Sequence, residues 1–514
     1  MKTSFEFFDH ANNELKLPMF SFSSKNWLEE VKYKNTLLGA MHPGIPMCLG
    51  KVPTRRELKE NETEINRYIQ LIREGIELGG EKLHLNFSSN SRTHGVGIFT
   101  KPDIASIYFG ANNPMSYINY GSILMTSCRK MLTFKGVNVL VVDDEHPDIR
   151  KTGLGDSHGK CSPRLLSILS DGIDRVDQEN KEFTPLQVRI GFPNKFLFKG
   201  TLMGWNNGVV PAAIRERYKV KGEGSDWDLI LTLSGIKGNK PADGTNLRSE
   251  PFYIGLVHPA EFREAKVSQQ FFMWFTRNAI ESDVVPGINQ ECQKLSAALK
   301  DRTLLPEVLR DLDRVADSEV AGQIDPESGE PISDAATETY IPPIVKILDA
   351  DKNGVLLEHP YINSKIRQLL GRTWLRLALN GDKRFASFMM QPDDSIPENS
   401  FVCGDLPPGP HIVFRNPILS AHSIRIAHNV RGYPYYEKLN GVAVMSHDTA
   451  SSWQGDFDGD FVTVIPLNKK QQEFAEELEE TDPAFADTDF EEYIKGNVKF
   501  DGDEYLNMIN HGSR

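Results

Sequence analysis

Three aspartates within five residues, in the stretch Asp456-Phe457-Asp458-Gly459-Asp460, constrain this chain more than any other feature. The residues that follow, 461–465, are mostly apolar and predict a buried strand. On an extended segment alternate side chains project to one side, so the three carboxylates would crowd together where that strand begins. Like charges this close are unfavourable unless a cation joins them, and ligation by oxygen alone suits a hard ion such as Mg²⁺. The sequence therefore predicts a catalytic metal site at Asp456, Asp458 and Asp460, where Gly459 lets the backbone bend.

A solvated acidic turn is the simplest alternative to this metal site, and a calcium loop is a second alternative. The EF-hand pattern needs Gly at its sixth position and an acid at its twelfth. Counted from Asp456, these positions hold Phe461 and Leu467, which excludes that calcium pattern. Another acidic stretch, 349–354, has the sixth-position Gly but a proline at the twelfth position, so it predicts a turn.

Length and composition describe a soluble globular protein with several domains. The 514 residues allow about three domains, at roughly 150 residues each. Hydrophobic residues make up 39% and charged residues 25%, and no apolar run is long enough for a transmembrane helix. The five cysteines are scattered without a C-x-x-C pair, which fits a reducing, intracellular setting. The net charge of −13 argues against a general nucleic-acid coat protein, although a local basic channel remains compatible with it.

The distribution of apolar residues predicts two β-rich regions separated by helices. Strands are expected at 136–142, 186–190, 195–203, 229–233 and 252–256, and again at 386–390, 400–403, 411–415, 441–445 and 461–466. Helices are expected at 54–77, from Ser162-Pro163 onward, within 259–315 and at 361–380. The acidic segment 316–339, which holds Gly and Pro, predicts a mobile loop, and the acidic tail beyond 471 predicts a solvated helix plus coil.

The stretch Trp453–Leu467 resembles the metal-binding loop of the two-barrel RNA polymerases. This superfamily comprises the multisubunit cellular enzymes, the eukaryotic RNA-directed polymerases of silencing and small phage-type single-chain relatives. The stretch His411–Arg425 is similar to the R-x-P strand and loop of the same enzymes. By this resemblance Asp456, Asp458 and Asp460 bind metal, and Arg415 faces the ribose of the incoming nucleotide. Gln454 stands where the cellular enzymes carry Asn, another ribose contact.

The first β region is similar to the first barrel of the silencing polymerases. Lys199, before Gly200, matches a catalytic lysine at their K-G turn, and Lys195 is a looser match to a second lysine. The stretch Asp156–Ser162 resembles their D-G-x-G-x-x-S element, with Ser157 in place of its first Gly. The resemblance runs in order from about residue 150 to residue 467. The cellular enzymes continue into long helices and a trigger element, so another chain could supply such parts here.

The resemblance implies an α+β fold with two six-stranded double-psi β-barrels joined by a helical region. The expected domains are an N-terminal α/β domain at 1–150, a first barrel at 151–265 and a helical connector at 266–380, with the mobile loop near 316–340. A second barrel at 381–468 carries the catalytic loop, and an acidic tail follows at 469–514. The expected chemistry is nucleotidyl transfer with two Mg²⁺ ions, which Mn²⁺ could replace. Lysines would stabilise the phosphate charge, and Arg415 with Gln454 would test for the 2′-hydroxyl.

The predicted function is template-directed RNA synthesis from NTPs by a compact single-chain polymerase. The short length favours a phage or bacterial enzyme, and from that a DNA template. The expected partners are the template, NTPs and the RNA product, with no membrane, in the cytoplasm or, for a eukaryotic protein, the nucleus. The alternatives are an RNA-directed RNA polymerase or primase, an inactive barrel that binds nucleic acid, and a metal-dependent nuclease or phosphohydrolase.

Overall fold

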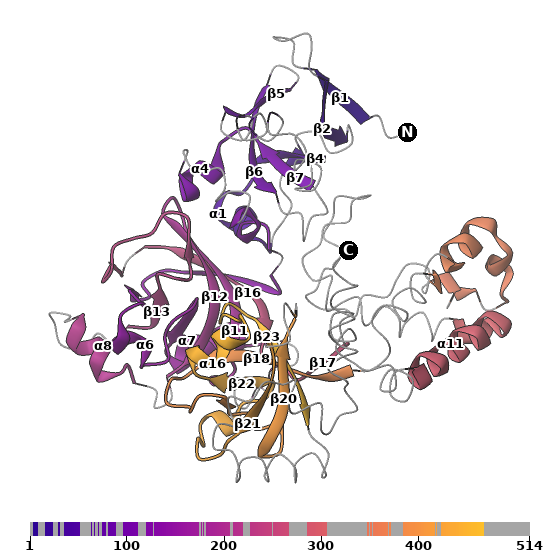
Figure 1. Ribbon diagram of the computed structural model, residues 1–514. Coiled ribbons are helices and arrows are strands. Elements are labelled where there is room, and N and C mark those ends of the chain that lie inside the picture. Colours follow the sequence, from indigo (N-terminus) through magenta and orange to yellow (C-terminus); the bar gives the residue numbers. More distant parts are fainter. Residues whose placement is uncertain are drawn as a thin grey trace. The chain divides into compact units, whose positions relative to one another are not determined.

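The computed structural model of the protein divides into two compact units (Figure 1). The first contains Met1–Pro259, and the second contains Ala260–Glu319 and Thr339–Arg514. The structure describes residues 4–8, 16–23, 29–30, 35–51, 63, 66, 70, 74–78, 81–88, 96–110, 120–126, 128–173, 176, 178, 181–205, 209–218, 227–248, 250–266, 285–305, 347–348, 350–351, 353–367, 370–371, 384–416, 418 and 423–466. The predicted mobile loop near 316–340 and the acidic tail at 469–514 lie outside these residues.

The first unit begins with a sheet of strands in the order β1-β2-β4-β7-β6-β5, with β3 paired to β4. Its strands are β1 (Ser4–Phe8), β2 (Lys16–Ser23), β3 (Glu29–Glu30), β4 (Pro46–Lys51), β5 (Ile76–Leu78), β6 (Glu81–Ser88) and β7 (Val96–Thr100). The helices α1 (Leu37–Met41) and α4 (Ile104–Phe109) and the 3₁₀ helix η2 (Gly121–Ile123) accompany it. The predicted helix 54–77 agrees with the helical residues 63, 66, 70 and 74, but it is wrong at its C-terminal end. There Gly75 has a left-handed φ of 82°, and the residues that follow form β5, which pairs with β6.

A larger sheet follows in the same unit, in the order β15-β9-β13-β10-β12-β11-β16-β8, with β14 on β12. Its strands are β8 (Lys130–Phe134), β9 (Val139–Val142), β10 (His158–Cys161), β11 (Leu186–Phe192), β12 (Phe196–Gly204), β13 (Leu229–Thr232), β14 (Ile236–Lys237), β15 (Asn246–Leu247) and β16 (Phe252–Pro259). Most pairs are antiparallel, whereas β10 with β12 and β9 with β13 are parallel. Because β8 and β9 belong to this sheet, it begins before residue 151, where the sequence placed the domain boundary.

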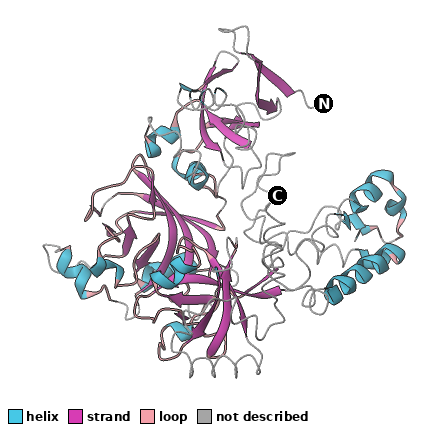
Figure 2. Ribbon diagram, viewed as in Figure 1, coloured by secondary structure: helices cyan, strands magenta, loops and turns pink. Residues whose placement is uncertain are grey.

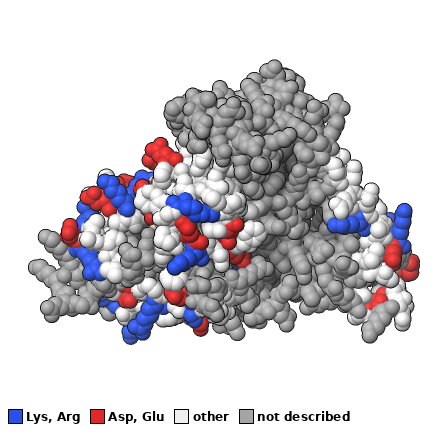
Figure 3. Space-filling view, turned by 90° about the horizontal axis from the view of Figure 1, so that it is seen from below, with Lys and Arg blue, Asp and Glu red and all other residues white. Residues whose placement is uncertain are grey.

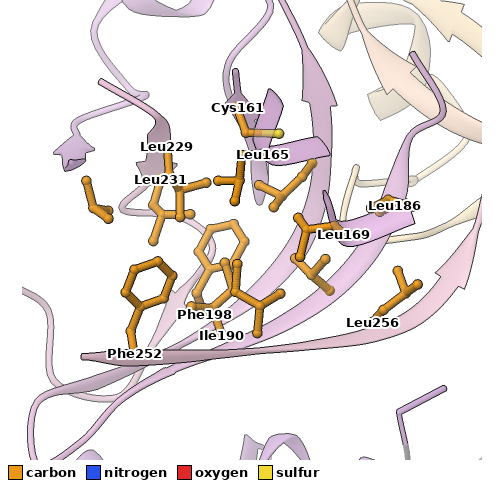
Figure 4. Packing of buried hydrophobic residues seen from close by; sticks show 14 of the residues in the cluster. Cys161, Leu165, Leu169, Leu186, Ile190, Phe198, Leu229, Leu231, Phe252 and Leu256 are labelled. Carbon is orange, nitrogen blue, oxygen red and sulfur yellow. The ribbon is translucent and has the colours of Figure 1, made fainter. Parts of the chain in front are cut away.

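The larger sheet packs around an apolar core, to which alternate side chains along its strands contribute (Figure 4). Ile190 and Phe198, which are paired across β11 and β12, both point into this core and are fully buried. Helix α7 (Pro163–Ser170) adds Leu165 and Leu169. As predicted, α7 starts at Ser162-Pro163, because the Ser162 hydroxyl accepts a hydrogen bond from the Leu165 amide. The helices α6 (Pro147–Arg150) and α8 (Ala212–Arg217) complete the described helices of this region.

The second unit contains a seven-stranded sheet, in the order β17-β18-β23-β20-β21-β19, with β22 paired to β18. All of these strands except β17 form a closed ring. The strands of the sheet are β17 (Arg263–Lys266), β18 (Arg384–Pro392), β19 (Ser400–Phe401), β20 (Gly409–Arg415), β21 (Ile424–Asn429), β22 (Val442–Met445) and β23 (Phe461–Pro466). Val402, next to β19, exchanges two backbone hydrogen bonds of 2.8 and 3.0 Å with Val444 of β22, which closes the ring. The double-psi topology of the two β regions stays a prediction.

The second unit also contains helices. They are α11 (Val285–Lys300), α16 (His447–Ser452), residues 347–348 with 350, residues 360–367 with 370–371, and the 3₁₀ helices η4 (Arg302–Leu304), η5 (Val355–Glu358) and η7 (Tyr436–Lys438). Figure 2 shows helices and strands mixed in this way, so the fold class is α+β. The helical prediction for 259–315 holds at α11 but is wrong at β17, which bonds to β18 instead. The turn predicted at 349–354 is confirmed at Asp351, whose carboxylate accepts hydrogen bonds from the amides of Val355 and Leu356.

The described part of the chain has a face of mixed charge (Figure 3) and no helix suited to crossing a membrane. On the face in Figure 3, basic and acidic side chains are interspersed among the described residues. None of the described helices has both the length and the apolar character needed to cross a bilayer.

Candidate metal centre

The three aspartates lie in a tight loop between helix α16 and strand β23. Helix α16 begins at a serine cap, where the Ser446 hydroxyl accepts a hydrogen bond from the Thr449 amide. At its other end, the amides of Gln454 and Gly455 donate to the carbonyls of Ser451 and Ala450. The chain therefore leaves the helix in a fixed direction and enters the aspartate loop directly.

The loop brings the three carboxylates together by turning, so the extended geometry expected from the sequence is wrong. Residues 457–459 form a turn, and Gly459 has a φ of 119°. One carboxylate oxygen from each of Asp456, Asp458 and Asp460 lies within 4.8 Å of the others. Asp458 is buried, whereas the other two are partly exposed. The turn is closed by the Asp456 amide, which donates to Asp460 Oδ2 at 3.2 Å.

Two aromatic side chains fasten the loop to the barrel. Phe457 is fully buried between two of the aspartates, and Trp453 is 2% exposed at the end of α16. Both pack in the apolar cluster that fills the six-stranded ring. Burial of such rings stabilises each by about 2 kcal/mol or more, so the loop is held against the apolar interior of the ring.

Arg415, the last residue of β20, binds the loop at two points. Its Nε lies 2.6 Å from Asp460 Oδ2, and one terminal nitrogen donates to the Gln454 carbonyl at 2.9 Å. The structure thus brings Arg415 and Gln454 to the predicted metal site. Three ionised carboxylates and one guanidinium leave a formal charge of −2, which one divalent cation would neutralise. These oxygen donors, crowded with like charge, fit Mg²⁺ or Mn²⁺.

The backbone between Trp453 and Asp456 is constrained by its neighbours. Gln454 has a φ of 55°, a left-handed conformation that costs a side-chain-bearing residue free energy and that the bond from Arg415 helps to hold. A Cβ on Gly455 would lie 2.7 Å from Met390 Cε and 3.2 Å from Arg415 Cδ. Glycine at this position therefore allows Arg415 to pass close to the loop.

The predicted lysines belong to the first unit. Lys199 lies within β12, opposite Arg189 of β11, so the K-G pair is part of the strand that the sequence predicted at 195–203. A Cβ on Gly200 would lie 1.9 Å from the Ser157 carbonyl oxygen, which explains the glycine after Lys199. Lys195 lies in the connection between β11 and β12 and forms an exposed ion pair of 2.5 Å with Glu250.

The element around Asp156 packs directly on this part of β12. Asp156 and Ser157 both have positive φ, at 45° and 71°, and the Ser157 carbonyl accepts a hydrogen bond from the Thr201 amide at 3.2 Å. Lys237 Nζ lies 3.3 Å from the Ser157 hydroxyl. The two stretches that resemble the first barrel of the silencing polymerases, 156–162 and 194–202, are therefore in contact with each other.

Sequence reasoning missed two residues beneath the aspartate loop, Asp394 and His447. They are hydrogen-bonded to each other, and His447 also contacts Phe457. No spacing rule identifies this pair, because 53 residues separate its members in the sequence.

Comparison with known proteins identifies no family for the chain. No family model matches it, and no curated protein matches it. One similar solved structure is the RNA-dependent RNA polymerase QDE-1 from Thielavia terrestris, with 14% sequence identity and a TM-score of 0.48. The match covers 84% of this chain and 50% of that polymerase, so it spans about half of the polymerase's length. The function is therefore argued from the residues of the site.

Proposed function

We propose that this chain is a nucleotidyltransferase that synthesises RNA on a nucleic-acid template from NTPs. The observation that carries the proposal is the convergence of three carboxylates beside Arg415 on the edge of a closed six-stranded ring. Asp456, Asp458 and Asp460 would hold the divalent cations, Mg²⁺ or Mn²⁺. When bound, such ions activate the attacking 3′-hydroxyl and neutralise the leaving pyrophosphate.

The protein's own residues would place the substrate. The Arg415 guanidinium lies against the Asp460 carboxylate, and a guanidinium is suited to recognition of a ribose hydroxyl or a phosphate. The Gln454 side chain is exposed beside it and can offer an amide to the same sugar. Lys199 would stabilise negative charge on the phosphates, and Lys195 would contribute a second positive charge nearby. These roles of Arg415, Gln454, Lys199 and Lys195 follow the resemblance and are part of the proposal.

The kind of template and the type of organism are part of the same proposal. A compact single-chain enzyme of phage or bacterial type favours a DNA template, and an RNA template or primase activity is the alternative within the class. An accessory chain could provide elements for translocation. An inactive nucleic-acid-binding barrel would have no use for three crowded carboxylates. A nuclease or phosphohydrolase would need no arginine placed to read a ribose.

The test is RNA synthesis with labelled NTPs and Mg²⁺ on single-stranded DNA and, separately, on single-stranded RNA. We expect template-dependent product on DNA, and product on RNA alone would select the RNA-directed alternative. Asp458→Asn is the control, because it keeps the size of the side chain but removes a carboxylate charge. We expect this variant to lose at least about three orders of magnitude in turnover, the upper range for one electrostatic group.

The same variant separates metal binding from folding. Because Asp458 is buried next to two like charges, its neutralisation should leave the metal-free protein at least as stable as wild type. Wild-type turnover in a folded Asp458→Asn protein, or synthesis that does not depend on a template, would contradict the proposal.

A further inference from the structure

Behind the aspartate loop lies a buried histidine that carboxylate bonds hold in place. Asp394 Oδ1 accepts hydrogen bonds from the His447 amide at 2.9 Å and from His447 Nδ1–H at 2.7 Å. The His447 side chain is 1% exposed, whereas that of Asp394 is 26% exposed. His447 Nε2 is buried and has no hydrogen-bond partner, so its bond to Asp394 fixes the orientation of the ring.

The histidine ring supports the one residue that separates two of the predicted metal ligands. His447 packs edge to face with Phe457, with ring centroids 5.2 Å apart and ring planes at 86°. Phe457 is fully buried, and its backbone connects Asp456 to Asp458. A shift of the Phe457 ring would therefore move both carboxylates, and with them the distance between their oxygens.

We infer that Asp394 and His447 are positioning residues that set the divalent-cation affinity of the aspartate loop. The pair holds the Phe457 ring, and the ring holds the spacing of Asp456 and Asp458. The consequence for catalysis rests on the proposed function, whereas the consequence for metal binding does not. Residues that orient metal ligands without touching the metal typically change affinity or activity by about 10- to 100-fold when they are replaced.

A simple structural role would be to start helix α16 and fill the barrel. Helix α16 already has its serine cap, so the contact with Phe457 is a separate feature of His447. His411 in the same unit is a matched control. It is also 1% exposed, its Nδ1 lies 2.8 Å from the Gly409 carbonyl oxygen, and its ring lies edge to face with Phe401 at 5.7 Å. A variant at His411 removes equivalent buried contacts that do not involve Phe457.

The experiment measures Mn²⁺ binding to the full chain without nucleotides, by calorimetry or electron paramagnetic resonance, together with thermal unfolding. His447→Gln keeps a hydrogen-bond donor but removes the ring, and we expect it to weaken Mn²⁺ binding by about tenfold or more. Asp394→Asn keeps an acceptor for both N–H groups and is expected to lose less. His411→Gln should lower the unfolding temperature and leave Mn²⁺ affinity unchanged. In an active enzyme, the Mg²⁺ concentration for half-maximal rate should rise most in His447→Gln, less in Asp394→Asn, and not in His411→Gln.

The outcomes separate the two proposals. Wild-type Mn²⁺ affinity in a folded His447→Gln protein would overturn the positioning role, even if wild-type protein makes RNA. Equal weakening in His411→Gln would also overturn it, because general softening of the barrel would then explain the loss. If wild-type protein binds Mn²⁺ but makes no RNA, the proposed function fails, and the positioning role is decided by the binding data. Absence of Mn²⁺ binding by wild-type protein would overturn both.

Discussion

Arg415 connects the proposed recognition of the sugar with the candidate metal site through a single side chain. In the structure its guanidinium contacts Asp460 and the Gln454 carbonyl, although the sequence suggested only a ribose contact. A cation at the carboxylates competes with the guanidinium for Asp460. Binding of a divalent ion could therefore free part of Arg415 for the nucleotide.

Replacement of Arg415 tests both roles. We expect Arg415→Ala to lower the preference for NTP over dNTP and to reduce overall turnover, because a group that recognises the 2′-hydroxyl is lost. Without nucleotide, the same variant should bind Mn²⁺ more tightly, since a competing positive charge next to Asp460 is removed. Arg415→Lys keeps the charge without the planar two-point contact, so it separates charge from geometry. Equal losses for NTP and dNTP would show that Arg415 does not read the sugar.

His411 gives the second unit a defined response to acid. Burial lowers the pKa of His411 below its ordinary value of 6.5, and the nearby charges of His428 and Arg431 lower it further. Between 6.5 and that lowered pKa the unfolded chain binds more protons at His411 than the folded protein does. The stability that His411 contributes is therefore fully present above pH 6.5 and is lost as the pH falls. We expect His411→Gln to have a flatter loss of unfolding free energy between pH 7 and pH 5 than wild type. Denaturant titrations at each pH measure this difference, and parallel profiles would contradict it.

The candidate site shows which residues a sequence can identify. Asp456, Asp458 and Asp460 were found because their ligand atoms come from one short stretch, whose spacing is visible without a fold. Asp394 and His447 meet only after the barrel has closed, so their pairing leaves no periodic signal. The loop conformation was also missed, because the left-handed φ of Gln454 occurs beside a contact with Arg415, 39 residues away in the sequence.

Among the elements, the predicted strands of both β regions were confirmed because their apolar runs are strong and short. Strand β21 was missed, because polar residues interrupt its apolar ones and no continuous apolar run marks it in the sequence. Strand β17 was assigned to a helix, because its four residues gain strand structure only from pairing with β18. Local propensity is a weak guide where the partner strand lies more than a hundred residues away.

The contact between β12 and the Asp156–Ser157 element gives a test of its own. In Gly200→Ala the new Cβ would meet the Ser157 carbonyl, a backbone atom of the turn that leads into β10. We expect a loss of about 2 kcal/mol or more in unfolding free energy, on the scale of overpacked cores. Gly371→Ala is the opposite case, because Gly371 is helical and exposed and has open space around its Cα. It should gain up to about 1 kcal/mol, and a loss at both positions would refute this reasoning.

At the scale of the whole molecule, the proposed function requires residues from both units to act on one substrate. Lys199 lies in the first unit, 257 residues before Asp456 in the second. If both serve one reaction, the Lys199 ammonium would stabilise phosphate charge close to the carboxylates. A compact cation with three donors is suited to that task. Lys195, in the connection that precedes β12, offers a comparison, because its charge is already paired with Glu250 at the surface.

We expect Lys199→Ala to lower turnover at saturating NTP by about two to three orders of magnitude, the usual loss for one preorganised charge-stabilising donor. Template affinity should change little, since one lysine contributes few of the backbone contacts. Lys195→Ala should have a much smaller effect, because an exposed ion pair contributes little and its loss leaves Glu250 in solvent. Near-normal turnover in a folded Lys199→Ala protein would show that the first unit does not take part in the chemistry.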